Sequence, residues 1–277
     1  MKISNRTLVS LVIWAGLAFP SIACGDTVLE YQVKEGEASK AKTQSIAIKN
    51  DQIMVKAAGG DKNLDLLYRH ASESVVIVDH RKRKLMTVDE QEVDRINQQA
   101  QKVQPLLQGL GKQVASMSPD KRKKLQELLG DKVSLDTIAR AAEPPVPTRL
   151  EQTGVKKVAG IQCRTVRVMQ GETPIAQVCL ADTAALKMSN ADAATIRALL
   201  DFYKRLAAKS QGLASQLGLT LPNISADEAA GIPIEFLDLS RENTDTMTLH
   251  RIDTSPVSPK LMQIPSDYEA VPLSLLP

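Results

Sequence analysis

Apolar and polar side chains alternate along the first sixty residues after Asp26, in short runs separated by polar turns. This period of two places the apolar side chains on one face of a β-strand. Asn50–Asp51 and Gly59–Asp61 carry the residue types that form tight turns between such runs. The pattern predicts an antiparallel meander over residues 26–88, with one aliphatic face that another element must cover. The expected strands lie near 29–33, 46–48, 53–55, 64–68, 75–78 and 85–88.

Two longer segments instead repeat their apolar residues at steps of three and four, which is typical of one face of a helix. Pro105 is expected to kink or divide the first helix between residues 101 and 104, and Asn190 is expected to cap the second. We expect both faces to pack on the sheet or on each other, and dimerisation through them is the alternative. The first face comprises Val93, Ile96, Ala100, Val103, Leu107, Leu110, Val114 and Met117; the second comprises Ile196, Leu199, Tyr203, Leu206, Ser210, Leu213 and Leu217.

Strand-like runs return after the proline cluster at 144–147, near 155–158, 162–169, 175–180, 232–239 and 246–252. The expected fold class is therefore α+β: a curved antiparallel β-sheet, a half-barrel, covered by helical insertions at about 89–142 and 183–217. Residues 26–277 are expected to form one domain, with an internal boundary, if there is one, at 143–148. The proline-punctuated end, 261–277, is expected to be irregular.

Residues 1–25 have the organisation of a secretory signal peptide: a basic start, an uncharged apolar run from Leu8 to Phe19, and small residues before Asp26. Cleavage after Gly25 would release a soluble protein into the periplasm. Cleavage after Ala23 would leave Cys24 as the lipidated first residue of a membrane-anchored lipoprotein, although Ser21 stands where that motif usually has Leu. Removing Lys2 and Arg6 from the 35 basic residues leaves 33 against 32 acidic ones, a charge of +1. Export argues against a nucleic-acid partner.

Cys163 and Cys179 lie in two strand-like runs joined by Gln170–Thr173, a plausible hairpin turn. In a hairpin centred on Gly171 the two cysteines face each other, at a Cα separation suited to a disulfide. We therefore predict a structural disulfide, which an exported chain would form in its oxidising compartment.

Candidate catalytic and metal-binding patterns are few. The three histidines, His70, His80 and His250, have no zinc-site spacing and are expected at strand ends in solvent. Motifs for a serine nucleophile, a phosphate loop or a dinucleotide are absent, so no metal and no cofactor is predicted. Aromatic residues make up only 3% of the chain, which argues against ring stacking on sugars or bases. A pocket here should have aliphatic walls.

Two basic runs could form a docking surface for an anionic membrane or an acidic envelope partner, at about 1 kcal/mol per residue near lipid. The ordinary alternative is that both are solvated faces of a turn and a helix. The runs are Arg81, Lys82, Arg83 and Lys84, and Lys121, Arg122, Lys123 and Lys124.

Four stretches carry a resemblance to exported bacterial proteins of a domain-of-unknown-function family and, more distantly, to the LolA and LolB lipoprotein carriers. They are Asp26–Tyr31, Val75–Asp79, Lys84–Val88 and Gln263–Tyr268. The resemblance implies a half-barrel with a helical cover around an apolar cavity, and no activity.

Together these observations predict a non-enzymatic periplasmic protein that binds an apolar ligand or an envelope protein on its curved sheet. The alternative is an interaction or assembly protein that docks through its helical faces or basic runs. A hydrolase is the weaker alternative, and it would need a histidine to meet Ser or Asp in the fold.

Overall fold

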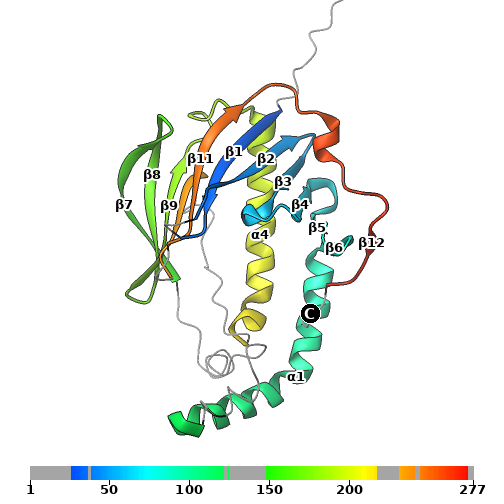
Figure 1. Cartoon of the computed structure of the whole chain (residues 1–277), viewed down its shortest axis with the longest axis vertical. Coiled ribbons are helices and arrows are strands. Elements are labelled where there is room, and N and C mark those ends of the chain that lie inside the picture. Colours follow the sequence, from blue (N-terminus) through cyan, green and yellow to red (C-terminus); the bar gives the residue numbers. More distant parts are fainter. Residues whose placement is uncertain are drawn as a thin grey trace, which may run out of the picture.

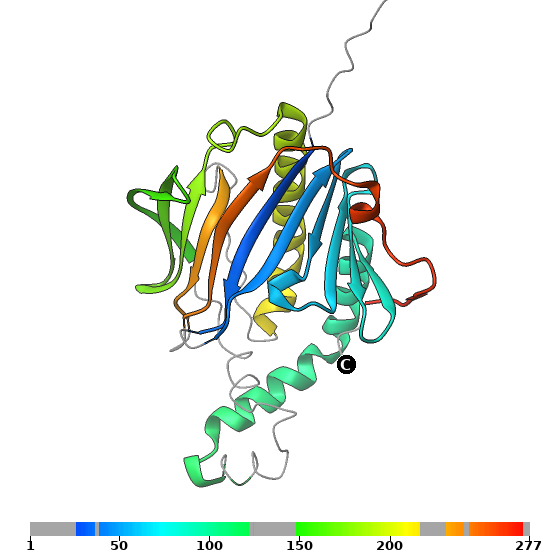
Figure 2. The same cartoon turned by 45° about the horizontal axis from the view of Figure 1, so that its top comes forward.

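The computed structural model describes residues 26–36, 39–121, 124, 148–216, 231–240 and 244–273. Their strands form one open, twelve-stranded sheet that is antiparallel apart from one short parallel pair (Figures 1 and 2). The strands are β1 (Thr27–Lys34), β2 (Lys42–Lys49), β3 (Gln52–Lys56), β4 (Leu64–Arg69), β5 (Ser74–Asp79), β6 (Lys84–Val88), β7 (Thr148–Val158), β8 (Ile161–Gln170), β9 (Thr173–Ala181), β10 (Ile232–Asp238), β11 (Thr246–Asp253) and β12 (Glu269–Ala270).

The order across the sheet is β12-β6-β5-β4-β3-β2-β1-β11-β10-β9-β8-β7. Strands β1–β6 form a meander, as the alternation predicts, and β7–β9 form a second one. The late strands β10 and β11 lie between these meanders, with Val28 of β1 opposite Asp253 of β11 and Ile232 of β10 opposite Ala181 of β9. A single sheet therefore runs from one half of the chain to the other.

Helix α4 (Asn190–Gln216) lies along one face of this sheet (Figure 2). Its Phe202 is fully buried against Ile48, Ile53 and Tyr68 of strands β2, β3 and β4. Ile196, Leu199 and Leu206 of the same helix pack on this cluster. The expectation that the second helical face packs on the sheet is thus met, but the aromatic residue that does so is Phe202. Tyr203, which the three-four spacing selects, is 48% exposed.

The other face of β2–β5 is covered by the C-terminal segment. Val257 and residues around the short 3₁₀ helix η4 (Pro259–Met262) pack on Met54, Leu67 and Val78. The segment then reaches the edge of the sheet, where β12 pairs with β6 in parallel. The expectation of an irregular tail is wrong for Glu269 and Ala270, the two residues of β12. A strand of this length is too short to show a hydrophobic period.

Helix α1 (Glu90–Ser116) starts beside α4 and bends strongly along its length, so that its far end lies away from the sheet (Figure 1). It is continuous through Pro105, which kinks a helix because proline lacks an amide hydrogen. Glu90 and Asp94 bind Arg205 and Lys209 of α4, at 2.8–3.1 Å. These ion pairs connect the first turns of α1 with the C-terminal half of α4. None of the described helices is long and apolar enough to cross a membrane.

The start of α4 also differs from the expected one. Ser189, rather than Asn190, caps the helix, because its Oγ accepts a hydrogen bond from the backbone N–H of Asp192 at 3.0 Å. The following lie outside the described residues: residues 1–25 with Cys24, residues 125–142 of the first expected helical insertion, most of the boundary at 143–148, and Leu217.

Candidate functional site

A cleft of about 620 Å³ opens beside α4, toward the ends of β9 and β10. Its apolar wall comes from Ala193, Ile196 and Leu200 on one side of the helix and from Ile232 at the start of β10. The three helical side chains are three or four residues apart on α4 and therefore line one face of it. The volume falls within the range of about 300–1,000 Å³ that is usual for small-molecule sites.

Charged side chains border this apolar wall. Arg197 and Asp201 of α4 and Asp182 at the end of β9 all line the cleft. Gly231, which also lines the cleft, directly precedes β10. Its φ is +124°, and a Cβ at this position would lie 3.0 Å from the carbonyl oxygen of Ala181, so the close approach of the two backbones requires glycine. The cleft therefore has an aliphatic wall, as the low aromatic content predicts, with both signs of charge at its rim.

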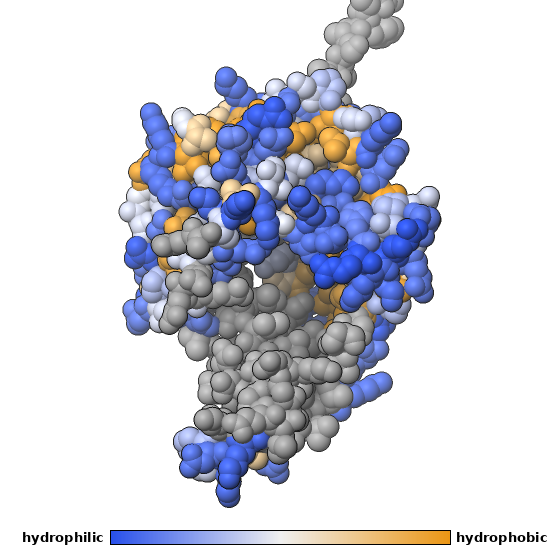
Figure 3. Space-filling view, in the orientation of Figure 1, coloured by the Kyte–Doolittle hydropathy of each residue, from blue (hydrophilic) through white to orange (hydrophobic). Residues whose placement is uncertain are grey.

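The space directly under α4 is filled rather than hollow. Phe202 and Tyr68 pack with their ring centroids 5.7 Å apart, and Leu186 and Ile234 are fully buried in the adjoining cluster. The cleft is thus on the flank of the helix, not beneath it. On the face in Figure 3, hydrophilic surface predominates and apolar surface appears in separate small areas. The large apolar side chains exposed among the described residues are Val155, Leu200, Tyr203 and Leu261.

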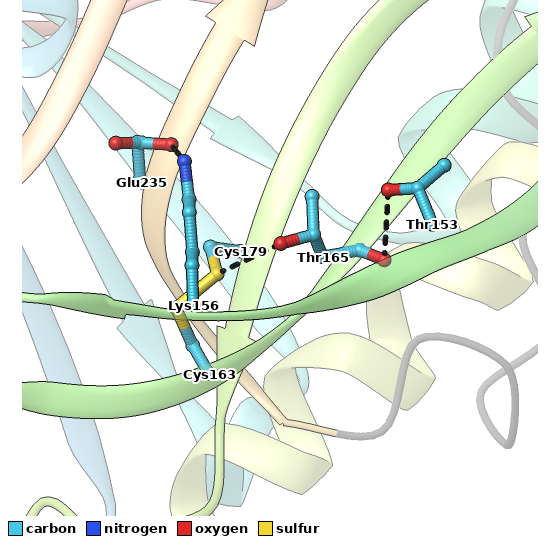
Figure 4. Close-up of a disulfide and its surroundings, with 6 residues drawn as sticks. All are labelled: Thr153, Lys156, Cys163, Thr165, Cys179 and Glu235. Carbon is cyan, nitrogen blue, oxygen red and sulfur yellow. Dashed lines mark hydrogen bonds and ion pairs between the residues drawn. A yellow bond between two sulfur atoms is a disulfide. The ribbon is translucent and has the colours of Figure 1, made fainter.

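The disulfide between Cys163 and Cys179 is confirmed, with its Cα atoms 5.5 Å apart (Figure 4). The predicted direct opposition of the two cysteines is wrong. Cys179 lies opposite Thr165 for two reasons: the turn is centred between Gly171 and Glu172, with Gln170 opposite Thr173, and β8 and β9 then shift register between Val168 and Met169. The bridge therefore links diagonal positions. Lys156, which is opposite Cys163 on β7, forms an ion pair with Glu235 of β10 beside the bridge. A disulfide of this kind indicates an oxidising compartment.

His80 lies in a cluster that the sequence does not reveal. Its Nε2 is 2.7 Å from Oδ2 of the buried Asp65, and its Nδ1 is 3.0 Å from the Tyr268 hydroxyl. Lys56 donates to the same carboxylate at 2.7 Å, and Arg83 binds Asp267. The expectation that each histidine lies at a strand end in solvent holds for His70. His80 directly follows β5 but is only partly exposed, and His250 is exposed but lies within β11. The cluster holds the C-terminal segment to the turn after β5.

The hydrogen bond between His80 and Asp65 supplies two of the side chains that a hydrolase would combine. The second nitrogen of His80, however, binds the tyrosine hydroxyl, and neither His80 nor Asp65 lines the cleft beside α4. Among the described residues no group of three or more His, Cys, Asp or Glu could hold a metal ion. The arrangement therefore fits a structural tie.

Replacing Asp65 with asparagine is expected to lower the free energy of unfolding by about 2 kcal/mol, because Lys56 and His80 then lose a charged partner. Burial alone would raise the pKa of this carboxyl, but the hydrogen bonds from Lys56, His80 and the Ala57 N–H hold that pKa below its usual value. Its stabilisation is therefore complete above about pH 5 and is lost as the pH falls through the folded-state pKa. Urea unfolding from pH 7 to pH 3 measures this.

The exposed Asp61→Asn variant is the control for that experiment, since Asp61 contacts mainly its own turn at Asn63. An Asp65→Asn protein as stable as the wild type, with the same acid dependence, would show that the cluster does not hold the fold.

The basic runs are placed only in part. Arg81, Lys82 and Arg83 are all exposed at the turn between β5 and β6, where Arg83 also binds Asp267. Lys84 lies opposite Glu269 in the sheet. Lys121 and Lys124 are exposed in the helical residues after α1. Arg122 and Lys123 lie outside the described residues. The two runs are not brought together by any described contact, and their role as a docking surface stays a prediction.

Sequence reasoning missed the cleft and most of its neighbourhood. Ile196 belongs to the predicted helical face, but Leu200 and Arg197 fall outside it. Four-residue spacing from Ile196 to Leu200 was the available signal, and nothing local indicated that Ile232 would join them. The reason is that β10 comes near α4 only through the strand order, which places β10 between β11 and β9.

Comparisons with known proteins give limited likeness. No protein-family model and no curated protein matches the chain. An uncharacterized conserved protein from Thermus thermophilus is similar at 8% identity and a TM-score of 0.39, over 90% of this chain and 91% of that one. The Pseudomonas aeruginosa MucA/MucB complex gives 11% identity and a TM-score of 0.32, over 89% of this chain and 58% of the matched chain. PNGF-II gives 5% identity and a TM-score of 0.38, over 89% and 30%.

The fold and the cleft thus define a class of protein: an open antiparallel sheet with one long helix on its face and a binding-sized cleft beside that helix. The chain spans less than two thirds of the MucB and PNGF-II chains. At TM-scores below 0.5 these likenesses assign no family, so the resemblance to the LolA and LolB carriers stays a prediction.

Proposed function

We propose that this chain is a non-enzymatic periplasmic protein that binds an apolar ligand in the cleft between α4 and the start of β10. The observation that carries the proposal is the aliphatic wall of Ala193, Ile196, Leu200 and Ile232 in a space of about 620 Å³. In this proposal the sheet curves as a half-barrel around α4, and the cleft is the part of its concave side that α4 leaves open.

The chemistry of the cleft suggests which ligand would fit. Aliphatic walls favour a flexible alkyl chain over a flat ring, because they offer apolar contact without a stacking partner. The rim carries Arg197 with Asp182 and Asp201, so a polar head group could remain at the opening. The Cys163–Cys179 disulfide supports an exported location, and the sequence of residues 1–25 supports export to the periplasm.

The Leu200→Trp substitution is expected to fill the cleft. It should weaken binding of an alkyl-chain probe about tenfold or more, because the probe would lose its apolar contacts. The probe is cis-parinaric acid, a linear-chain fatty acid whose fluorescence rises in apolar surroundings, with displacement by a C16 fatty acid. Titration of the delipidated protein measures the dissociation constants of both.

Leu261→Trp is the matched control, since Leu261 is 39% exposed and Leu200 is 38% exposed, but Leu261 lies on η4. Equal weakening by both variants, or probe binding that Leu200→Trp leaves unchanged, would exclude this cleft as the ligand site. Mass spectrometry of solvent extracts from native protein would identify any ligand carried from the cell.

A protein partner is the second candidate occupant of this surface. Leu200 and Tyr203, three residues apart, are both substantially exposed on the same helix, and aromatic side chains are enriched in the centres of protein interfaces. A photo-crosslinking amino acid at position 203 would capture a defined envelope protein, while the same group at position 261 would not. A single product at position 203, together with protein that carries no extractable lipid, would favour this candidate over the first.

A further inference from the structure

Two buried carboxylates meet where β1 begins. Asp26 is 6% exposed and Asp192, in the first turn of α4, is 2% exposed. Oδ2 of Asp26 accepts hydrogen bonds from Lys49 at 2.6 Å and from the Val257 backbone N–H at 2.7 Å. Oδ2 of Asp192 accepts from the Thr27 hydroxyl at 2.7 Å. Thr27, which follows Asp26 and starts β1, thus connects the strand with the carboxylate on the helix.

The second oxygen of Asp26, Oδ1, is buried and has no hydrogen-bond partner among the described residues. Such an oxygen is unusual, because a buried acceptor without a donor costs about 1–3 kcal/mol and more when it is charged. Lys49, from β2, is the one cation that contacts either carboxylate within the part of the chain that the structure describes. The positive end of the α4 dipole adds part of a charge near Asp192.

The pair is therefore short of positive charge. Burial raises the pKa of Asp192, the hydrogen bonds at Thr27 and Ser189 oppose this, and the negative charge of Asp26 raises it further. Asp51 at the end of the β2–β3 turn and Asp253 of β11 are the other acids in this region, through contacts to Thr195 and register with Val28. No described side chain supplies the missing cation.

We propose that the missing cation is the α-ammonium group of Asp26 itself, created when the peptide bond between Gly25 and Asp26 is hydrolysed. An envelope endopeptidase would add one water across this bond: the C–N bond breaks, Gly25 keeps the new carboxylate, and the nitrogen stays on Asp26 and takes up a proton. The new ammonium is four bonds from the Asp26 carboxylate oxygens. It supplies donors for Oδ1 and balances the second carboxylate of the pair.

This arrangement makes removal of residues 1–25 a step that completes the folded core. The position of the cut matters in the proposal. A chain that starts at Gly25 carries the same net charge, but its ammonium is one residue away from the carboxylates. A chain that starts at an acylated Cys24 carries no free ammonium. The proposal does not depend on what binds in the cleft beside α4, which is lined by other residues.

The first test is the N-terminus of the protein purified from the cell envelope, read by intact mass and by mass spectrometry of its N-terminal peptide. Asp26 is expected as the first residue, with an unmodified amine. A mature chain that begins elsewhere, or that carries an acylated Cys24, would overturn the proposal even if the protein binds an alkyl ligand.

The second test compares two purified chains, one starting at Asp26 and one at Gly25, by urea unfolding near pH 6.5. The Asp26 chain is expected to have an unfolding equilibrium constant about tenfold smaller, as for a folded-state amine pKa about one unit above its usual 7.7–8.0. Because that pKa is raised, the difference is complete below about pH 7 and disappears as the pH rises through the folded-state value. Equal stability of the two chains at pH 6.5 would overturn the proposal.

Asp192→Asn provides the internal control, because asparagine keeps an acceptor for Thr27 while it removes one negative charge. In this variant the difference between the two chains is expected to shrink, and the Gly25 chain is expected to gain stability over its wild-type form. If the Gly25 chain instead loses stability with Asp192→Asn, the carboxylate is not short of positive charge and the proposal fails.

Discussion

The Phe202→Ala substitution is expected to lower the free energy of unfolding by about 4 kcal/mol, which is within the range for buried Phe→Ala substitutions. Phe202 is fully buried and joins α4 to three strands through Ile48, Ile53 and Tyr68. Truncation would remove the ring contact with Tyr68 and leave a cavity between the helix and the sheet. Urea unfolding followed by circular dichroism measures the change as a lower midpoint at an unchanged slope.

Tyr203→Ala is the matched control for that variant. Tyr203 is the next residue on the same helix and is 48% exposed, so its truncation is expected to change stability by less than about 1 kcal/mol. The reverse order, with Tyr203 as the costlier truncation, would mean that α4 is rotated relative to the packing described above. The pair therefore tests the orientation of the helix as well as the size of the effect.

Replacing both Cys163 and Cys179 with alanine is expected to lower the free energy of unfolding by about 3 kcal/mol, because a closed loop of this size restricts the unfolded chain by about that amount in the chain-entropy model. The bridge spans 16 residues. Both cysteines are buried, so the two alanines also lose packing of the sulfur atoms, and Thr165 loses its contact with the Cys179 sulfur at 3.5 Å. The measurement is urea unfolding of the double variant against the oxidised wild type, each with and without dithiothreitol.

Reductant distinguishes the bridge from the packing of its side chains. Dithiothreitol should bring the wild type down toward the double variant and leave the double variant unchanged. If the double variant unfolds at the wild-type urea midpoint, β7, β8 and β9 hold their register without the bridge. In that case the disulfide forms because the protein is in an oxidising compartment, and it does not stabilise the fold.

Local pattern accounts for much of the fold because it depends on residues that are neighbours in the chain. Alternation over Leu29, Tyr31 and Val33 determines a strand with one buried face, whatever that face packs against. The same holds for the helices, whose spacing requires only neighbouring turns. The cysteine pair could also be predicted, since its two strands share one short turn between Gln170 and Thr173.

Register and rotation are less well determined by local pattern. The hairpin turn is centred between Gly171 and Glu172 rather than on Gly171, and a shift between Val168 and Met169 adds to this offset, so Cys179 lies opposite Thr165. A bulge adds a residue to one strand, and a composition pattern does not reveal it. Phe202 and Tyr203 are consecutive on α4, about 100° apart around the helix. Either one is compatible with a face of three-four spacing, and the strands beneath decided which was buried.

By itself, then, the sequence determined the kinds of elements, their chain order, the disulfide partners and the aliphatic character of any pocket. The tertiary structure alone decided which strands became neighbours, since Val28 meets Asp253 across more than two hundred residues. It also decided that Asp65, His80 and Tyr268 meet and that Asp26 lies beside the first turn of α4. The physical reason is that hydrophobic periodicity specifies which side of an element avoids water. Which other element then covers that side depends on the shape and packing of the whole chain.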